Sequence, residues 1–366
     1  MDVLCEIRNR IAHFTLNRPA ALNALSLDMV TELQTQLLRC AKDPAINAVL
    51  LRGAGEKAFC AGGDIRALYE NHKATGKIDL EFFEREYPLD YLLRFYPKPV
   101  VAVINGIVMG GGMGLAQGAR WRIVGERTRM AMPEVGIGFF PDVGGSYFLP
   151  RLPGALGNYL ALTGSQIRGA DALHAGLADC YLAPAAISQL DKTLDAIDWT
   201  AGVSDTEALD AAVRSLQGDP GPAPLLAWRE AVDAHFAPAD VRAILAALER
   251  EKRPQFAQWA QSTLETLRSR SPTMLAVAAR QLARGRDMDF AGCLRMELGM
   301  VHQCFLQGDF PEGVRALLID KDNAPRWKPP RLEDVGAAQV EYIFKDPWEG
   351  DAHPLAHIEG VLESCN

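Results

Sequence analysis

The sequence predicts an α/β domain followed by a mainly helical region. Two short apolar runs, residues 48–51 and 100–104, each lead into a turn with a glycine, which is typical of buried parallel strands. Residues 121–124 form a further strand after a short helix. Strand and helix patterns alternate as far as about Leu182, and after Pro184 almost every segment has the helical period. We therefore expect ligands at the carboxyl ends of the strands in the first half of the chain.

The N-terminal elements are predicted to be a hairpin and an amphipathic helix. The runs Val3–Arg8 and Arg10–Leu16 alternate in polarity and meet at Asn9, which favours a tight turn. Apolar residues then recur at helical spacing behind Ser26, a favoured N-cap, and Pro44 ends the helix. This helix crosses back to the sheet.

The chain is expected to divide into three parts. Residues 1–183 form the core with the active site, and residues 184–345 form a helical region that covers this site or builds an oligomer interface. Residues 346–366 are expected to be a poorly ordered tail.

Composition excludes several classes of protein. Of 366 residues, 48% are hydrophobic, which is enough for a large core, so a disordered or fibrous chain is excluded. The 38 basic and 46 acidic residues give a net charge of −8, which disfavours nucleic acid as a partner. The chain has no apolar stretch of the roughly 20 residues that a membrane helix needs. A strand-like run begins at Val3, so we expect no leader sequence and a cytoplasmic protein.

No metal or redox group is expected. The seven cysteines are scattered without a Cys-x-x-Cys pair, so they are interpreted as reduced structural thiols. His353 and His357 are four residues apart, but Pro354 between them disfavours a shared helix face and hence a metal site.

Two glycine-rich segments follow predicted strands. The segment Phe59–Ile65 contains Gly62 and Gly63 and precedes a helix, so its backbone N–H groups can approach a ligand; the alternative is a plain turn with Asp64 as helix cap. The second, Asn105–Leu115, lacks the third glycine of a dinucleotide-binding fingerprint. Two N–H groups that converge on one oxygen form an oxyanion hole, where each donor contributes on the order of 3 kcal/mol.

Two carboxylates follow these segments. Glu134 stands among apolar residues and glycines, a setting that raises a carboxyl pKa and suits a general base or nucleophile; an exposed Glu beside a proline turn is the alternative. Asp142 comes eight residues later in a Pro-Asp-x-Gly sequence, which is also common in ordinary turns. Phe148 replaces the second glycine of a nucleophile elbow, so a serine esterase is not supported.

Together and in this order, the segments resemble the crotonase superfamily, also called the enoyl-CoA hydratase/isomerase superfamily. The resemblance covers nearly all of residues 1–182 and rests on the segments Leu16–Pro19, Ala21–Leu25, Ala58–Asp64 and Gly110–Gly114. It implies a ClpP/crotonase-like spiral of ββα units with a helical C-terminal region. It also implies a coenzyme A thioester as substrate, with the thioester carbonyl held by the N–H groups of Gly63 and Gly111.

The resemblance is closest to the subgroup of 3-hydroxyisobutyryl-CoA hydrolases. Hydratases carry a first catalytic glutamate where this chain has Gly114, which cannot transfer a proton, and usually an uncharged residue where it has Asp142. The segments that match the hydrolases are Phe82–Tyr87, Phe140–Leu152, Ser271–Thr273, Asp309–Asp322 and Trp327–Pro329.

By this resemblance, Glu134 attacks the thioester carbonyl or activates a water molecule that does so. Asp142 orients the nucleophile or the substrate hydroxyl and transfers the proton to the leaving thiolate. Glu86 lines the acyl pocket and binds the 3-hydroxyl. Coenzyme A belongs to the substrate, and no further cofactor is implied. The residues implied in substrate binding, largely through the backbone, are Leu22, Ala24, Leu25, Ala61, Gly62, Asp64 and Ile65. Arg18 and Arg66 are candidates for the phosphates.

The implied reaction, hydrolysis of 3-hydroxyisobutyryl-CoA, belongs to valine catabolism. One alternative is a hydratase, isomerase or acyl-CoA decarboxylase that works with Glu134 alone. A more distant alternative is a non-catalytic acyl-CoA-binding or RNA-binding protein. The net charge of −8 disfavours RNA binding, and the presence of both Glu134 and Asp142 disfavours a protein without catalysis. A pocket of this type can also accept 3-hydroxypropionyl-CoA, since one methyl group gives only about 1–3 kcal/mol of discrimination. The resemblance implies a homotrimer or hexamer as the possible assembly.

Overall fold

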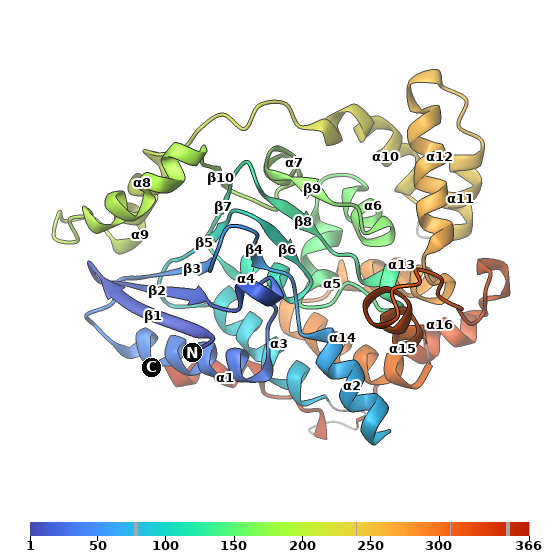
Figure 1. Ribbon diagram of the computed structural model, residues 1–366, viewed down its shortest axis with the longest axis horizontal. Coiled ribbons are helices and arrows are strands. Elements are labelled where there is room, and N and C mark those ends of the chain that lie inside the picture. Colours follow the sequence, from blue (N-terminus) through green and yellow to red (C-terminus); the bar gives the residue numbers. More distant parts are fainter. Residues whose placement is uncertain (77–79, 239, 308, 349–351, 366) are drawn as a thin grey trace.

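The computed structural model describes residues 1–76, 80–238, 240–307, 309–348 and 352–365. A six-stranded sheet in the order β1-β2-β3-β5-β7-β10 lies at its centre (Figure 1). The first pair is antiparallel and all later neighbours are parallel. The strands are β1 (Val3–Arg8), β2 (Ile11–Leu16), β3 (Ala48–Gly53), β5 (Val100–Ile104), β7 (Trp121–Val124) and β10 (Cys180–Tyr181). These bounds confirm the predicted hairpin, with Asn9 and Arg10 as its two left-handed turn residues, and the predicted parallel strands.

A smaller sheet in the order β4-β6-β8-β9 carries the loops of interest. Its strands are β4 (Ala58–Cys60), β6 (Ile107–Met109), β8 (Arg129–Ala131) and β9 (Ile167–Arg168), and the first three are parallel. The pairs β3/β4, β5/β6 and β7/β8 each give one strand to each sheet before the chain returns through helices. The chain thus winds through ββα units. The sequence predicts no strand at these four positions, because runs of two or three residues are too short to show a period.

Helices cover both faces of the large sheet. Along β3, Val49 and Leu51 pack into the main core, whereas Ala48 and Leu50 face a smaller core under α8 and α9. The helix predicted behind Ser26 is present, and Ser26 Oγ accepts a hydrogen bond of 3.2 Å from the backbone N–H of residue 29. The helices of this half are α1 (Leu27–Lys42), α2 (Ile65–Thr75), α3 (Glu81–Arg94), α4 (Gly111–Gly118), α5 (Gly145–Phe148), α6 (Leu156–Thr163) and α7 (Gly169–Ala175).

The described residues after Pro184 form helices and no strand, as the sequence predicts. Residues 218–223 form an extended connection between the α8–α9 pair and the remaining helices (Figure 1). The helices are α8 (Pro184–Asp195), α9 (Asp205–Arg214), α10 (Arg229–Phe236), α11 (Val241–Glu249), α12 (Pro254–Ser269), α13 (Pro272–Gly285), α14 (Phe290–Gln307), α15 (Asp309–Val314), a π-helical turn (Arg315–Ile319) and α16 (Ala337–Ile343). None of the helices that the structure describes is long and apolar enough to cross a membrane.

The C-terminal segment differs from its expectation. The sequence predicts poor order from residue 346 onward, but Leu355 and Ile358 are buried within residues 352–365. Short 3-10 turns at Ile358–Val361 and Glu363–Cys365 bring this segment against α3 and α1. The described part of the tail is therefore packed, because these two buried side chains join the main core and Val361 and Leu362 pack against it.

Candidate active site

A cavity of about 510 Å³ lies at the carboxyl ends of the parallel strands β4, β6 and β8. The segments that follow these strands supply its floor, as expected for ligand sites in parallel sheets. The cavity is lined by Ala21, Ala24, Ala61, Gly62, Gly63, Asp64, Ile65, Arg66, Phe82, Phe83, Glu86, Met109, Gly110, Gly111, Pro133, Glu134, Ile137, Phe139, Asp142 and Leu318. It thus brings together the residues predicted to be catalytic.

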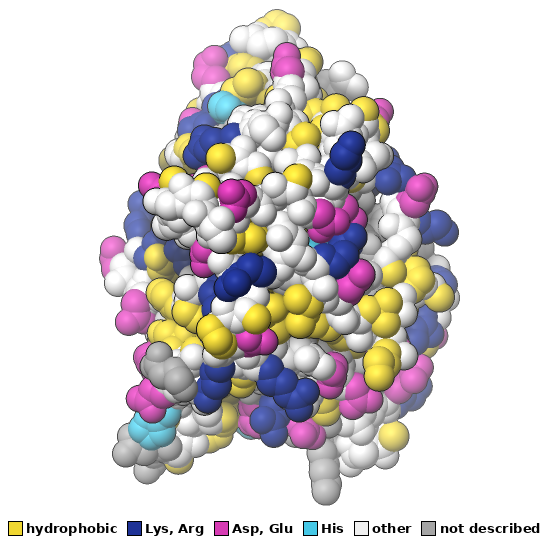
Figure 2. All heavy atoms as spheres, turned by 90° about the vertical axis from the view of Figure 1, so that its left-hand side faces the viewer, with side chains coloured by type: hydrophobic (Ala, Val, Ile, Leu, Met, Phe, Trp, Pro, Cys, Tyr) yellow, Lys and Arg dark blue, Asp and Glu magenta, His cyan; other side chains and the backbone are white. Residues whose placement is uncertain are grey.

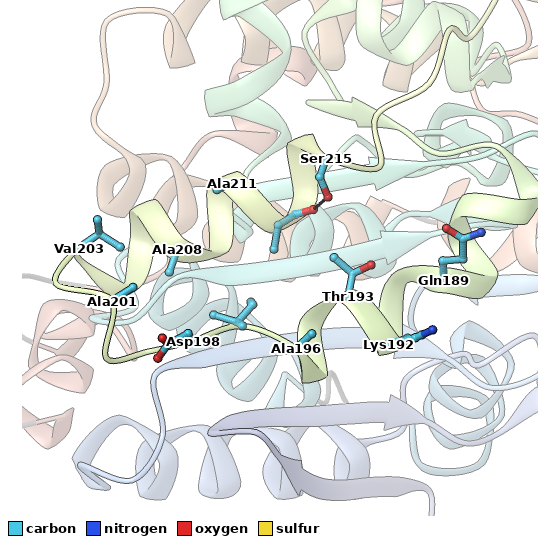
Figure 3. Close-up of a pocket in the computed structure, with 12 residues that line it drawn as sticks. Gln189, Lys192, Thr193, Ala196, Asp198, Ala201, Val203, Ala208, Ala211 and Ser215 are labelled. Carbon is cyan, nitrogen blue, oxygen red and sulfur yellow. Dashed lines mark hydrogen bonds between the residues drawn. The ribbon is translucent and has the colours of Figure 1, made fainter.

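A wider cavity of about 880 Å³ lies between α8 and α9 (Figure 3). Alanines form much of its wall, with Lys192 and Asp198 at its edge, and none of the predicted site residues lines it. The surrounding face mixes Lys and Arg with Asp and Glu side chains instead of gathering one sign of charge (Figure 2). Because the predicted site residues line the cavity of about 510 Å³, this smaller cavity is the candidate active site.

The backbone N–H groups of Gly63 and Gly111 are close together at this cavity. A Cβ atom built on Gly111 would lie 3.4 Å from the backbone nitrogen of Gly63. Gly111 is the first residue of α4, so its N–H has no acceptor within the helix. Gly63 pairs with Leu25 in an isolated parallel bridge, but the two hydrogen bonds of this bridge use the residues on either side of Gly63. Gly62 O accepts a hydrogen bond of 2.8 Å from Leu25 N–H, and Asp64 N–H donates one of 2.9 Å to Leu25 O. Both N–H groups are thus available for one ligand oxygen.

The loop at Leu22–Leu25 is bound to the Ala61–Asp64 segment. Ala61 N–H donates to Leu22 O at 3.1 Å, and the Arg18 guanidinium joins Ala24 O and the Asp64 carboxylate at 2.8 and 3.0 Å. The two segments predicted to bind substrate are therefore neighbours. Leu25 is fully buried in the core, so its side chain does not line the cavity, and neither does Leu22 within the described lining.

Glu134 projects toward the glycine cluster from a 3-10 turn, Glu134–Ile137. A Cβ atom built on Gly110 would lie 3.1 Å from Glu134 Oε1, and Oε2 has no hydrogen-bond partner among the described residues. Burial, and secondarily the nearby Asp142 carboxyl, raises the pKa of Glu134 well above its ordinary value. The alternative of an exposed glutamate is wrong, because Glu134 is 6% exposed. Once ionised, such a carboxylate is a strong base or nucleophile.

Asp142 lies on the same cavity and accepts a hydrogen bond of 2.9 Å from the hydroxyl of Tyr87. Burial raises the pKa of Asp142 to about 7, against the opposing effect of the Tyr87 hydrogen bond. The residue is therefore able to give and take a proton near neutral pH.

Glu86, from α3, completes a group of three buried carboxyls. Its Oε1 lies so close to Gly111 that a Cβ there would collide with it, and this oxygen has no partner within the described ranges. Burial, and then Asp142, raises the pKa of Glu86 well above its usual range. Three buried carboxyls that share one cavity disfavour simultaneous ionisation, so Glu86, Glu134 and Asp142 together retain protons that the site can transfer.

Aromatic and aliphatic side chains close the cavity. Phe82, Phe83 and Phe139 come from the first half of the chain, and Leu318 comes from the C-terminal region. Arg66, which also lines the cavity, donates a hydrogen bond of 2.5 Å to Leu318 O, so α2 and the C-terminal region meet at the cavity. The helical region thus contributes one wall of the cavity.

Tyr87 is a neighbour of Asp142 at the cavity that the sequence analysis did not single out. Its hydrogen bond to Asp142 joins positions 55 residues apart, and no local spacing predicts such a contact. The only signal is indirect: Tyr87 follows Glu86, and a buried tyrosine hydroxyl usually has a polar partner.

The fold and this cavity define a crotonase-fold enzyme, and comparison with known proteins agrees. A family model described as enoyl-CoA hydratase/isomerase matches residues 11–344, so the chain belongs to this family. A 3-hydroxyisobutyryl-CoA hydrolase of mitochondria from Danio rerio is 42% identical over 353 residues, which are 96% of this chain and 91% of that protein. The 3-hydroxyisobutyryl-CoA hydrolase 1 of Arabidopsis thaliana is 38% identical over 350 residues, 94% of this chain and 91% of that protein.

Solved structures confirm the predicted fold. A protein described as a carnitinyl-CoA dehydratase from Mycobacterium thermoresistibile superposes with a TM-score of 0.87 at 36% identity, covering 97% of this chain and 99% of that chain. One described as an enoyl-CoA hydratase from Rhodobacter sphaeroides superposes with a TM-score of 0.84 at 35% identity, covering 95% of this chain and 98% of that chain.

Proposed function

We propose that this chain hydrolyses 3-hydroxyisobutyryl-CoA to 3-hydroxyisobutyrate and free coenzyme A, a step of valine catabolism. The observation that supports this most is the meeting of two backbone donors, Gly63 and Gly111, with two buried carboxyls, Glu134 and Asp142, in one cavity. The relatives at 42% and 38% identity carry the name of this activity. Gly114 replaces the first glutamate expected of a hydratase.

In the proposed reaction, the N–H groups of Gly63 and Gly111 hold the thioester oxygen and stabilise the negative charge that develops on it. Glu134 then has two routes. As a nucleophile, its carboxylate forms a C–O bond to the carbonyl carbon while the C–S bond breaks, and water later cleaves the resulting anhydride. As a base, it removes a proton from a water that attacks the same carbon directly.

Asp142 is proposed to transfer the proton that the leaving thiolate needs. In its neutral form it gives a proton to the departing thiolate, and as a carboxylate it recovers one from the hydrolytic water, so each turnover restores the starting state. Glu86 is proposed to bind the 3-hydroxyl group, since its unpartnered Oε1 is beside Gly111. The residues proposed to contact coenzyme A are those of the Leu22–Leu25 and Ala61–Ile65 segments. No step requires a metal or redox cofactor.

The test is release of free thiol from 3-hydroxyisobutyryl-CoA by the purified protein, with and without Glu134→Gln. We expect thiol release by the wild type, at least 10³-fold slower turnover by the variant, roughly the loss typical of a removed catalytic group, and similar thioester binding by both. If the Glu134→Gln variant released thiol at the wild-type rate, Glu134 would have no role in the mechanism. A single turnover in ¹⁸O water tests the anhydride route: water that attacks the Glu134 carbonyl of the anhydride leaves ¹⁸O in the Glu134 carboxylate, whereas direct attack of water on the thioester places ¹⁸O only in the released acid.

A hydratase is the second candidate, because two solved relatives at 36% and 35% identity are described as a dehydratase and a hydratase of CoA thioesters. Crotonyl-CoA distinguishes the two: loss of its double bond without thiol release would favour the hydratase. The choice between 3-hydroxyisobutyryl and 3-hydroxypropionyl thioesters requires kcat/KM for both. The assembly as a trimer or hexamer and the cytoplasmic location stay predictions. Several relatives are named as mitochondrial, so these relatives do not support a cytoplasmic location.

A further inference from the structure

The turn that carries Asp142 has a strained backbone. Val143 has φ of +50° and Gly144 has φ of +84°, so two successive residues are in the left-handed region. A β-branched residue such as valine rarely adopts this conformation, and it persists only where the surrounding structure holds it. The turn's own backbone supplies one hydrogen bond of 2.7 Å, from Gly145 N–H to Asp142 O. Further contacts are needed to hold the segment.

Glu297, on α14 of the C-terminal region, supplies two of these contacts. Its Oε2 accepts a hydrogen bond of 2.8 Å from Gly144 N–H, and its Oε1 accepts one of 2.9 Å from Ser146 N–H. The side chain is fully buried, and more than 150 residues separate it from the turn. Glu297 does not line the catalytic cavity within the described lining, so any effect on the reaction passes through the turn.

Gln281, on α13, binds the same turn. Its Nε2 donates to Pro141 O at 2.6 Å and to Ser146 Oγ at 2.8 Å. The two helices therefore hold the segment before Asp142 and the segment after it. This arrangement leaves Asp142 with little freedom to turn away from Tyr87 and the cavity.

We infer that Glu297 is a positioning residue for Asp142: its carboxyl binds the peptide N–H groups of Gly144 and Ser146 and so fixes the strained turn that presents Asp142 to the substrate. The inference rests on the proposed role of Asp142 in hydrolysis. It also gives the C-terminal helical region a part in catalysis that is distinct from covering the cavity.

Glutamine cannot replace Glu297 without loss. Its side-chain amide has the same shape, but it offers an acceptor on one atom only, and its NH₂ group faces the second N–H. Glu297→Gln therefore releases one end of the turn. Because misplacement of a catalytic group by about 1 Å costs on the order of 10²-fold in rate, we expect kcat to fall about 30- to 100-fold while KM changes less than about threefold.

A double-mutant cycle with Asp142→Asn tests the inference. If Glu297 acts through the Asp142 carboxylate, Glu297→Gln will lower kcat about 30-fold or more in the wild type, but less than about threefold in the Asp142→Asn protein. The matched control is Gln303→Leu, which removes another buried side chain of α14 whose Nε2 donates to Lys345 O at 2.9 Å. It is expected to lower stability and to leave kcat unchanged.

The outcomes of this cycle distinguish a failure of the inference about Glu297 from a failure of the proposed role of Asp142. Near-wild-type kcat for Asp142→Asn would overturn the proposed role of Asp142 itself. With Asp142→Asn impaired, an unchanged kcat for Glu297→Gln, equal losses in both backgrounds, or an equal loss for Gln303→Leu would overturn the inference. If Glu297→Gln does not fold, Gln281→Met replaces it, because it frees the same turn and must show the same dependence on Asp142.

Discussion

Replacing Asp90 by asparagine should change how the stability of this protein depends on pH. Asp90 is on α3, is fully buried, and has no hydrogen-bond partner for either carboxyl oxygen in the described part of the chain. Burial, followed by the facing carboxyls of Glu86, Asp142 and Glu297, raises the pKa of Asp90 well above its ordinary value. The folded protein therefore holds this proton in a range of pH where the unfolded chain, with an aspartate pKa near 3.9, has released it.

The sign and size follow from proton linkage. The neutral carboxyl contributes its full stability below about pH 4, and this contribution is lost as pH rises toward the folded-state pKa, at about 1.4 kcal/mol per pH unit for one proton. Between pH 5 and 7 the wild type should therefore lose stability through Asp90, at up to this rate. Asparagine has the same shape and no proton to lose, so the free energy of unfolding of Asp90→Asn should exceed that of the wild type by a margin that grows as pH rises.

Urea unfolding at pH 5, 6 and 7 measures the difference. Exposed Asp287 provides the control, and Asp287→Asn should give a curve parallel to that of the wild type. Thioester hydrolysis by Asp90→Asn should stay within about threefold of the wild type, because Asp90 does not line the cavity in the described structure. A stability difference that is the same at all three pH values would refute the reasoning, since it would mean that Asp90 is already ionised in the folded protein.

Three further changes test the site and its frame. Tyr87→Phe removes the hydrogen bond that lowers the pKa of Asp142, so this pKa should rise from about 7 and the midpoint of the pH–kcat profile should move upward; an unmoved midpoint would contradict the assignment. Gly111→Ala brings a Cβ against Glu86 Oε1 and to 3.4 Å from the Gly63 nitrogen, inside the proposed oxyanion hole, and should lower kcat about 10²-fold; Gly360→Ala, whose Cβ meets nothing within 4 Å, should not. Asn23→Ala removes two buried hydrogen bonds of 3.0 and 2.9 Å and should cost about 2–3 kcal/mol in urea unfolding; a loss below 0.5 kcal/mol, roughly that of a surface substitution, would contradict it.

The sequence predicts which residues meet at the cavity, because each of them is part of a local motif; their catalytic roles stay predictions. Gly63 and Gly111 stand at fixed places after short strands, and Glu134 and Asp142 stand in apolar, glycine-rich segments whose order is specific to one superfamily. A spiral of ββα units then brings the ends of successive strands to one cavity. Local sequence is sufficient for these residues, because the fold aligns the strand ends without further information.

Residues that act across the fold could not be predicted in the same way. Tyr87 and Glu297 bind the Asp142 segment from 55 and more than 150 residues away, and no spacing within one element records such a contact. Glu297 did carry a usable signal. It lies between Leu294 and Val301 on the apolar face of α14, where a buried carboxyl needs donors to satisfy it.

The packing around Gly114 shows why the carboxyls of this chain are arranged as they are. A Cβ atom at this position would lie 2.6 Å from Asp90 Oδ1 and 2.8 Å from its Cγ, so the Asp90 carboxyl occupies the space that any side chain at position 114 would need. By the resemblance to hydratases, that side chain would be their first glutamate. A glutamate cannot be added at Gly114 while α3 keeps Asp90 in place. In the proposed reaction, a second proton-transferring carboxyl beside Glu134 must then come from elsewhere. Asp142, which binds the Tyr87 hydroxyl and whose turn binds Glu297, is placed to supply it.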